Sequence, residues 1–241
     1  MKKITFDEMW KKLEKYLTVD KALEQGFSNG KYTAVLAKYA KQVVGIDIDE
    51  NFLKIAEENL KDYNNIELLL MDSKKMTFPD KSFDVILNTS FHEFDLSHGT
   101  FSMNLDLKRE ILEEMTRVSD TIVFVEPTED AITNELFKVF DPSEEHAIRI
   151  GKSNELIKSY LEGEGYKLVE TGLTFNDDHF SSREELEEEM LAWWADIKIP
   201  STEEEKQDMI SQIDTILENA GMLNDLHVVE DIRFNVFKKE D

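Results

Sequence analysis

The chain has 241 residues, 41% of them hydrophobic, which is enough for one domain with a core of its own. Its 28 lysines and arginines stand against 52 aspartates and glutamates, and the net charge of −24 repels phosphate backbones and makes nucleic acid a poor candidate partner. Cysteine is absent, which excludes disulfides, thiolate metal sites and cysteine nucleophiles. The acidity fits a soluble protein of a salt-rich cytoplasm or one with a cationic ligand, and by itself it identifies no substrate.

The N-terminal segment predicts an amphipathic helix, because Phe6, Trp10, Leu13 and Leu17 recur at spacings of three and four residues. We interpret residues 1–17 as a lid helix whose Trp10 faces a bound substrate. No apolar signal segment follows the first lysines, and no stretch approaches the ~18 apolar residues of a membrane span. We therefore expect a cytoplasmic protein with no membrane partner.

Beyond residue 17, strand-like and helix-like segments alternate. The expected strands are residues 43–46, 66–70, 83–87, 121–125, 166–169 and 228–237, and the expected helices are residues 32–39, 50–60, 108–118 and one that begins near 153. This alternation indicates parallel βαβ units with helices on both faces of the sheet. Apolar and polar residues alternate along the last segment, which indicates an antiparallel strand.

A helical insertion, residues 181–220, interrupts this alternation. Ser182 with Glu185, and Ser201 with Glu204, fit the S/T-x-x-E capping box, so two cap helices are expected. The glutamates between 184 and 189 are interpreted as a solvated helix face. The polar run 176–179 is interpreted as a loop, and no metal site is expected.

A glycine-containing turn follows the first short strand, in residues 23–30. Gly26 and Gly30 allow the backbone to approach a ligand, and Glu24 at the strand end can accept hydrogen bonds. A purely structural βα turn explains this pattern equally well. The next strand, however, ends at Asp47, about 20 residues past the turn, where a carboxylate can accept hydrogen bonds from both ribose hydroxyls of an adenosine.

With these motifs the chain resembles the class I S-adenosylmethionine-dependent methyltransferases, in particular the group that includes the ubiquinone and menaquinone biosynthesis enzymes. The resemblance runs from about residue 17 to 166 and is carried by the strings ALEQGFSNGKYT, VVGIDID, LLLMDSKKMTFPDKSFDVIL and EILEEMTRVSDTIVFVEP. It implies a single α/β domain over residues 1–241, with a Rossmann-like, mostly parallel seven-stranded sheet in the order 3-2-1-4-5-7-6, an antiparallel last strand and a helical cap. S-adenosylmethionine is the implied cofactor, and the implied activity is in-line methyl transfer to an unidentified small-molecule acceptor.

Residue by residue, the resemblance places Glu24, Gly26 and Asn88 near the methionine end of the cofactor, Asp47 at the ribose, and Asp72 with the backbone near Ser73 at the adenine. The complete expected cofactor set is Glu24, Gly26, Ser28, Gly30, Asp47, Ile48, Asp72, Ser73 and Asn88.

The chain departs from the family pattern in two places. Ser28 replaces a glycine of the turn, and the loop at Ser119 lacks the usual Gly-Gly before the fifth strand. Both departures leave open an alternative, a non-catalytic cofactor-binding or partner-binding module that has kept the fold.

Four residues are candidates for the acceptor side: Trp10, His92, His146 and Trp193. His92 follows the fourth strand and is the candidate general base, if the acceptor must lose a proton. The alternatives remain a packing or capping role for His92, a surface helix for His146, and a core position for Trp193. The acceptor atom cannot be read from these residues.

Overall fold

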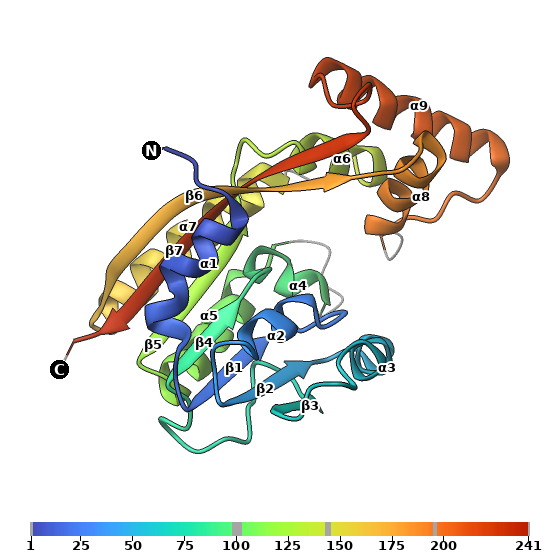
Figure 1. The fold of residues 1–241 in the computed structure, drawn as a ribbon. Coiled ribbons are helices and arrows are strands. Elements are labelled where there is room, and N and C mark those ends of the chain that lie inside the picture. The colour runs from blue at the N-terminus through green and yellow to red at the C-terminus, as the bar shows by residue number, and fades with distance from the viewer. Residues whose placement is uncertain (1, 98–102, 143–145, 195–196, 241) are drawn as a thin grey trace.

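A mixed sheet organises the computed structural model, which describes residues 2–97, 103–142, 146–194 and 197–240 (Figure 1). Its strands are β1 (Lys21–Gln25), β2 (Gln42–Asp47), β3 (Ile66–Leu70), β4 (Val85–Asn88), β5 (Thr121–Pro127), β6 (Tyr166–His179) and β7 (His227–Lys239). The helices are α1 (Phe6–Leu17), α2 (Lys31–Leu36), α3 (Glu50–Asn59), the 3₁₀ turn η1 (Phe91–Glu93), α4 (Phe94–Ser97), α5 (Leu105–Val118), α6 (Thr133–Phe140), α7 (His146–Gly163), α8 (Arg183–Trp193) and α9 (Glu203–Asn219).

The strand order is β3-β2-β1-β4-β5-β7-β6. Strands β1 to β5 pair in parallel, and β7 is antiparallel to both of its neighbours. Every residue of β4 and β5 is buried, which explains why these strands are apolar runs rather than alternating patterns. The predicted fold class and strand order are confirmed.

Helix α1 covers one face of this sheet. Thr5 caps it through a capping box with Glu8, and its apolar stripe is buried among side chains of the central strands and β7. Trp10 is 5% exposed and lies in this stripe. The helix was predicted correctly and its apolar stripe packs on the sheet face, while its role as a lid stays a prediction.

Strands β6 and β7 are longer than predicted and form a two-stranded arm. Their register runs without a break in pairing partners from the far edge of the sheet out to His179 opposite His227, apart from one bulge near Leu168. Figure 1 shows that the arm continues past the other strands and carries α8 and α9 at its tip. The expected loop at 176–179 is therefore wrong, because β7 provides a hydrogen-bonding partner for residues whose polar character suggested a loop.

The insertion contains the two expected helices. Ser182 caps α8 by accepting a hydrogen bond from the backbone of Glu185, as predicted. Helix α9 begins one residue later than expected, because Thr202 is its cap and accepts from the backbone of Glu205. The Ser201 side chain instead donates to the Glu205 carboxylate, so the predicted Ser201–Glu204 box is wrong.

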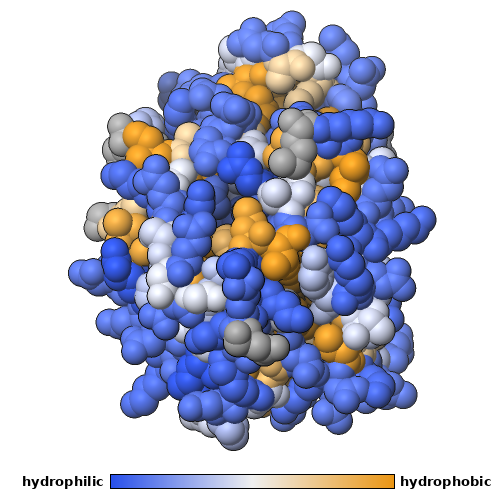
Figure 2. Space-filling model, turned by 90° about the vertical axis from the view of Figure 1, so that its left-hand side faces the viewer, coloured by the Kyte–Doolittle hydropathy of each residue, from blue (hydrophilic) through white to orange (hydrophobic). Residues whose placement is uncertain are grey.

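The surface is dominated by hydrophilic side chains on the face that Figure 2 shows, and hydrophobic residues form separate small patches there. In the part of the chain that the structure describes, no helix combines the length and apolarity needed to cross a bilayer.

Candidate cofactor and acceptor sites

Two adjoining cavities lie at the carboxyl ends of the parallel strands. The turn cavity, about 460 Å³, lies beside the turn after β1 and is lined by Gly26, Ser28, Asp47, Ile48, Phe52, Met71, Ser73, Ser90, Glu93, Phe94, Ala192, Trp193, Trp194 and Ile197. The histidine cavity, about 230 Å³, is lined by Tyr32, Thr89, Ser90, His92, Glu93, Val125, Glu126, Pro127, Thr133, His146, Asn176, Asp178, Trp193, Trp194, Glu230 and Ile232. Ligands of open α/β sheets bind at this end of the strands.

The turn after β1 shapes the first cavity through its backbone. Gly26 has φ +74°, and a Cβ there would lie 3.1 Å from the Phe94 ring. A larger side chain at this position would therefore collide with Phe94 at the edge of the cavity. Ser28 also adopts a positive φ, 47°, and its backbone N–H donates to the Asp47 carboxylate at 2.9 Å. A second N–H, from Asp49, donates to the other Asp47 oxygen at 3.0 Å. The Asp47 carboxylate is thereby held in place at the end of β2.

The predicted cofactor residues divide into two groups. Five of them line the turn cavity: Gly26, Ser28, Asp47, Ile48 and Ser73. The other four, Glu24, Gly30, Asp72 and Asn88, do not line it and support the turns behind it. Asp72 accepts from the backbone of Lys74, Asn88 accepts from the backbone of Ser90, and Gly30 packs against Leu60.

Glu24 is fully buried beneath the turn. Its Oε2 accepts a hydrogen bond from the Thr33 hydroxyl, and its Oε1 has no hydrogen-bond partner among the described residues. Burial raises the pKa of Glu24 to about 8, and the nearby Asp47 charge adds to the effect, while the Thr33 hydrogen bond opposes it. At neutral pH this carboxyl is therefore largely protonated in the ligand-free chain.

The floor of the histidine cavity is η1, and Glu126 at the end of β5 anchors it. The two Glu126 oxygens accept backbone N–H groups of Phe91 at 2.6 Å and His92 at 3.2 Å, and Oε2 also lies 2.6 Å from His92 Nδ1. Three contacts to one carboxylate fix both the backbone and the ring of His92. Of these two residues only His92 was predicted from the sequence, because no local pattern distinguishes Glu126.

A buried charge cluster holds η1 from the opposite side. Lys108 Nζ donates to the carbonyl oxygens of Phe91 at 2.7 Å and His92 at 2.8 Å, and it lies 3.1 Å from Asp95. Arg149 pairs with the same aspartate at 2.7 Å. The three charged side chains are fully buried, so η1 is held rigidly between Glu126 and Lys108.

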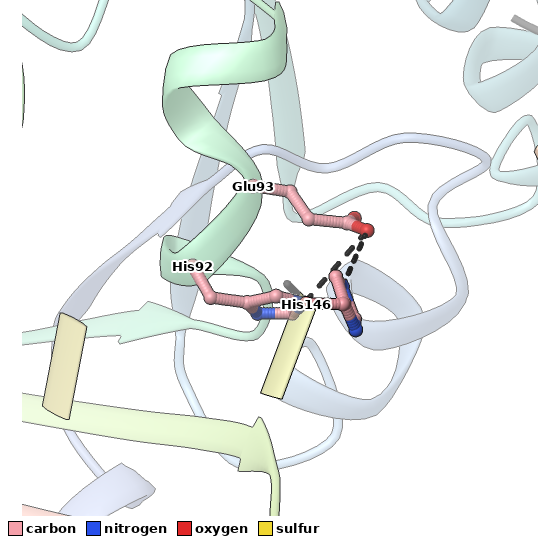
Figure 3. Close-up of side chains that lie close together, drawn as sticks. All are labelled: His92, Glu93 and His146. Carbon is pink, nitrogen blue, oxygen red and sulfur yellow. Dashed lines mark ion pairs between the residues drawn. The ribbon is translucent and has the colours of Figure 1, made fainter. Parts of the chain in front are cut away.

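His146, at the start of α7, approaches His92 across the cavity (Figure 3). Its ring stacks on Phe137, and its Nδ1 lies 2.8 Å from Asn134 Oδ1. Glu93 Oε1 lies 3.5 Å from His146 Nε2 and 3.7 Å from His92 Nε2, so one carboxylate faces both imidazoles.

This arrangement sets the charges of the three groups. Burial alone would lower the pKa of His92, but the Glu126 and Glu93 carboxylates outweigh it and raise that pKa. Burial would raise the pKa of Glu93, yet the two histidines hold it at about 2. Burial lowers the pKa of His146. The two carboxylates therefore shift His92 toward its charged form, and its role as a base stays a prediction.

The two cavities share a wall formed by Ser90, Glu93, Trp193 and Trp194. The indole rings of the two tryptophans lie edge to face, 5.6 Å apart. Trp193 and His146 therefore line a cavity, and their place on the acceptor side stays a prediction. Trp10 lines neither cavity and lies behind Tyr32, with 6.0 Å between their ring centroids.

The part of the chain that forms most of the turn cavity is similar to a known protein family. Residues 23–120, which include the turn, Asp47 and β4, match the family model described as a methyltransferase domain. These residues form a methyltransferase domain. The resemblance to class I S-adenosylmethionine-dependent methyltransferases that the sequence indicated is confirmed.

Relatives of the methyltransferase domain differ in what they methylate. A demethylmenaquinone methyltransferase of Staphylococcus carnosus is 35% identical over 69 residues, which are 27% of this chain and 29% of the relative. A ribosomal RNA small subunit methyltransferase A of Levilactobacillus brevis is 38% identical over 60 residues, 25% of this chain and 20% of the relative. The chain thus matches less than a third of the length of either relative.

The fold similarity extends well beyond the methyltransferase domain. A solved structure of a protein from Bacillus halodurans C-125, classed as a methyltransferase, superposes with a TM-score of 0.64 at 17% identity, covering 97% of this chain and 98% of that one. At this identity the match shows a common fold, and it does not identify a substrate.

Proposed function

We propose that this protein transfers a methyl group from S-adenosylmethionine, bound in the turn cavity, to a small-molecule acceptor, bound in the histidine cavity. The observation that carries the proposal is the shared wall of the two cavities at Ser90, Glu93, Trp193 and Trp194. Because the same four residues line both cavities, a donor bound in one cavity and an acceptor bound in the other would lie next to each other.

The turn cavity suits an adenosine with a methionine tail. Asp47 presents a carboxylate held by two backbone N–H groups, which fits hydrogen bonds from ribose hydroxyls. Ile48, Phe52 and Met71 offer apolar contacts for a purine ring. The glycine at 26 leaves the space that a Cβ would occupy, and the unpartnered Oε1 of Glu24 fits a polar group at the methionine end.

The protein's part in the reaction is mainly alignment and exclusion of water. S-adenosylmethionine, when bound, supplies a methyl group already activated on a sulfonium. The rigid η1 segment and the two tryptophans hold the acceptor in line with that methyl group, and such positioning can contribute about 7–11 kcal/mol to lowering the barrier. The acceptor's lone pair forms the new bond to carbon as the carbon–sulfur bond breaks, and the electron pair stays on sulfur.

The dimensions and charge of the histidine cavity favour a small acceptor over RNA. Its volume is about 230 Å³, and Glu93, Glu126, Asp178 and Glu230 all line it. These carboxylates and the net charge of −24 oppose a phosphate backbone. The ribosomal RNA relative therefore indicates the donor half of the reaction rather than the acceptor.

The test begins with calorimetry of S-adenosylmethionine binding to the purified chain. Formation of S-adenosylhomocysteine is then measured with a panel of small metabolites and, separately, with ribosomal RNA. We expect binding and turnover with at least one small molecule, and mass spectrometry of co-purified ligands would guide the panel. Absence of cofactor binding would overturn the proposal, and turnover only with RNA would reassign the acceptor. Binding without turnover on any acceptor would support the alternative of a non-catalytic module.

A further inference from the structure

Three side chains converge in the histidine cavity with the donor set of a metal centre (Figure 3). Ligand atoms of His92, Glu93 and His146 all lie within 4.8 Å of one another. The two histidines are 5% and 2% exposed, and they come from η1 and from the start of α7, which are far apart in sequence. A packing or hydrogen-bonding role alone would require each imidazole nitrogen to have a partner.

His146 does not meet that requirement. The Asn134 amide nitrogen donates to the carbonyl oxygens of Thr128 and Glu129, which orients Asn134 Oδ1 toward the imidazole as an acceptor. His146 Nδ1 must therefore carry the hydrogen of this contact. The other nitrogen, Nε2, is buried and has no hydrogen-bond partner in the described part of the chain, and in the neutral ring it carries a lone pair.

His92 is held at its Nδ1 in a similar way, and a bound metal ion would displace the proton that Nε2 carries in the charged form. Its Nδ1 lies 2.6 Å from Glu126 Oε2, so the hydrogen on this nitrogen is donated to a carboxylate. Its Nε2 points toward Glu93, at 3.7 Å. Metal-bound histidines in proteins typically donate their second N–H to a carboxylate or carbonyl oxygen, which fixes the tautomer and the ring orientation. Both imidazoles are held in this way, with both Nε2 atoms directed to the same carboxylate.

We propose that His92, Glu93 and His146 bind a first-row transition-metal dication of the Zn²⁺ or Fe²⁺ type in the histidine cavity. Two imidazole nitrogens and one carboxylate oxygen are the ligands that such ions accept, and three protein ligands leave a position open. Neighbouring ligands of a tetrahedral Zn²⁺ lie roughly 3.4 Å apart. Glu93 Oε1 lies at a similar distance from the two Nε2 atoms, 3.5 Å from that of His146 and 3.7 Å from that of His92. The surrounding Glu126 and Asp178 favour a dication.

The open position faces the cavity assigned above to the acceptor, and this part of the inference rests on the proposed function. An acceptor with an ionisable O–H, N–H or S–H group would bind the ion through that heteroatom and release its proton to water. The resulting lone pair attacks the methyl carbon, the carbon–sulfur bond breaks, and S-adenosylhomocysteine leaves. No oxidant or reductant is required.

The test measures metal binding itself and does not depend on turnover. Chain freed of metal by chelation is titrated with Zn²⁺ and, separately, with Co²⁺, whose visible absorption reports coordination geometry; bound metal is counted by mass spectrometry. We expect one ion per chain. His146→Ala and Glu93→Gln should each weaken binding at least about 100-fold, because loss of a direct ligand exceeds the 10–100-fold cost of losing an outer partner.

A second cluster on the arm provides the matched control. Asp177, His179 and His227 also lie within ligand distance of one another, but they lie near the surface, where histidines bind added metal weakly. The double variant His179→Ala/His227→Ala should keep the tight site. Loss of the tight site in this double variant, or its survival in His146→Ala with a native circular dichroism spectrum, would overturn the proposal, as would absence of stoichiometric binding to wild type.

The failure of this proposal can be told apart from failure of the proposed function. His146 does not line the turn cavity, so His146→Ala should bind S-adenosylmethionine with an affinity within a few-fold of wild type. If wild type binds metal but no cofactor, the proposed function fails and the metal site stands. If it binds cofactor but no metal, the reverse holds.

Discussion

The turn cavity and the histidine cavity share one wall but are built by different means. One side of the turn cavity is shaped by backbone: two residues with positive φ, and N–H groups that fix the Asp47 carboxylate. The histidine cavity is formed by side chains from η1, β5, α7 and the arm, held by the buried charges of Lys108 and Glu126. The backbone-shaped side of the turn cavity depends on one short stretch, whereas the histidine cavity depends on how distant elements pack together.

This difference predicts that substitutions should separate binding of the cofactor from stability and acceptor chemistry. Changes in the turn should affect the cofactor alone. Changes under η1 should affect stability and the histidine cavity, while leaving the turn cavity largely intact.

The largest effect is expected for Gly26→Val. A β-branched residue resists φ +74°, and its side chain would collide with Phe94, so S-adenosylmethionine binding should fall below detection. The control is Gly163→Val, since nothing lies within 4 Å of a Cβ at that position. Calorimetry on both folded variants decides the question. Wild-type affinity in Gly26→Val would show that the turn does not cradle the cofactor.

Lys108→Met should be the most damaging change under η1. It leaves the Phe91 and His92 carbonyl oxygens without their buried donor and removes a partner of Asp95, and disrupting such a pair costs about 3–5 kcal/mol. Lys138→Met provides the control, because Lys138 pairs with Glu135 at the surface. Chemical denaturation should show a large loss only for Lys108→Met, while the folded fraction keeps cofactor affinity within tenfold. Equal losses in both variants would contradict a clamping role for Lys108.

Asp47→Ala should weaken cofactor binding by about 1.5–3 kcal/mol, the contribution of a charge-assisted hydrogen bond, or roughly 10- to 150-fold in Kd. Asp20→Ala removes an exposed carboxylate paired with Lys41 and controls for the change in charge. Titration calorimetry at one salt concentration compares the two. An unchanged Kd in folded Asp47→Ala would exclude this residue from the site.

Glu24→Gln should produce the smallest effect, and it should depend on pH. Because the folded pKa of about 8 lies above the ordinary value of 4.5, the folded state holds a proton that the unfolded state releases, so wild-type stability falls as pH rises from about 4.5 to 8. The glutamine variant lacks this loss and should be more stable by about 1–2 kcal/mol at pH 9, since the burial of an amide offsets part of the ~1.4 kcal/mol per pKa unit. At pH 5 it should not exceed wild type. Thermal unfolding at both pH values measures this, and identical pH profiles would place Glu24 in contact with water.

The sequence predicted the turn cavity better than the histidine cavity for a physical reason. Gly26, Ser28 and Asp47 lie within one βαβ unit, where local spacing determines position, and the strand order followed from the family resemblance. His92 and His146 were recognised as separate candidates, but their meeting at Glu93 depends on how α7 packs against η1. The expectation of no metal came from reading the polar run 176–179 as a loop, and ligands that meet only through long-range packing leave no such local pattern.

The length of β6 and the packing of α1 also depend on long-range contacts that local sequence patterns do not reveal. Polar residues at 176–179 read as a loop because their strand character comes from pairing with β7. The apolar stripe of α1 indicated correctly that it covers something, but only the packing shows that this is the sheet face.

The arm carries a segment, between Phe180 and Leu226, that could be exchanged as a unit. At its tip the backbone N–H of Phe180 donates to the carbonyl oxygen of Leu226 at 2.9 Å, so the chain leaves and returns at a single point. Between these residues an insertion of any length closes with an entropy cost that rises only logarithmically with its length. The segment also contributes Trp193 and Trp194 to the shared wall. Under the proposed function, replacing this segment would change which acceptor is methylated without altering the residues proposed to hold the donor.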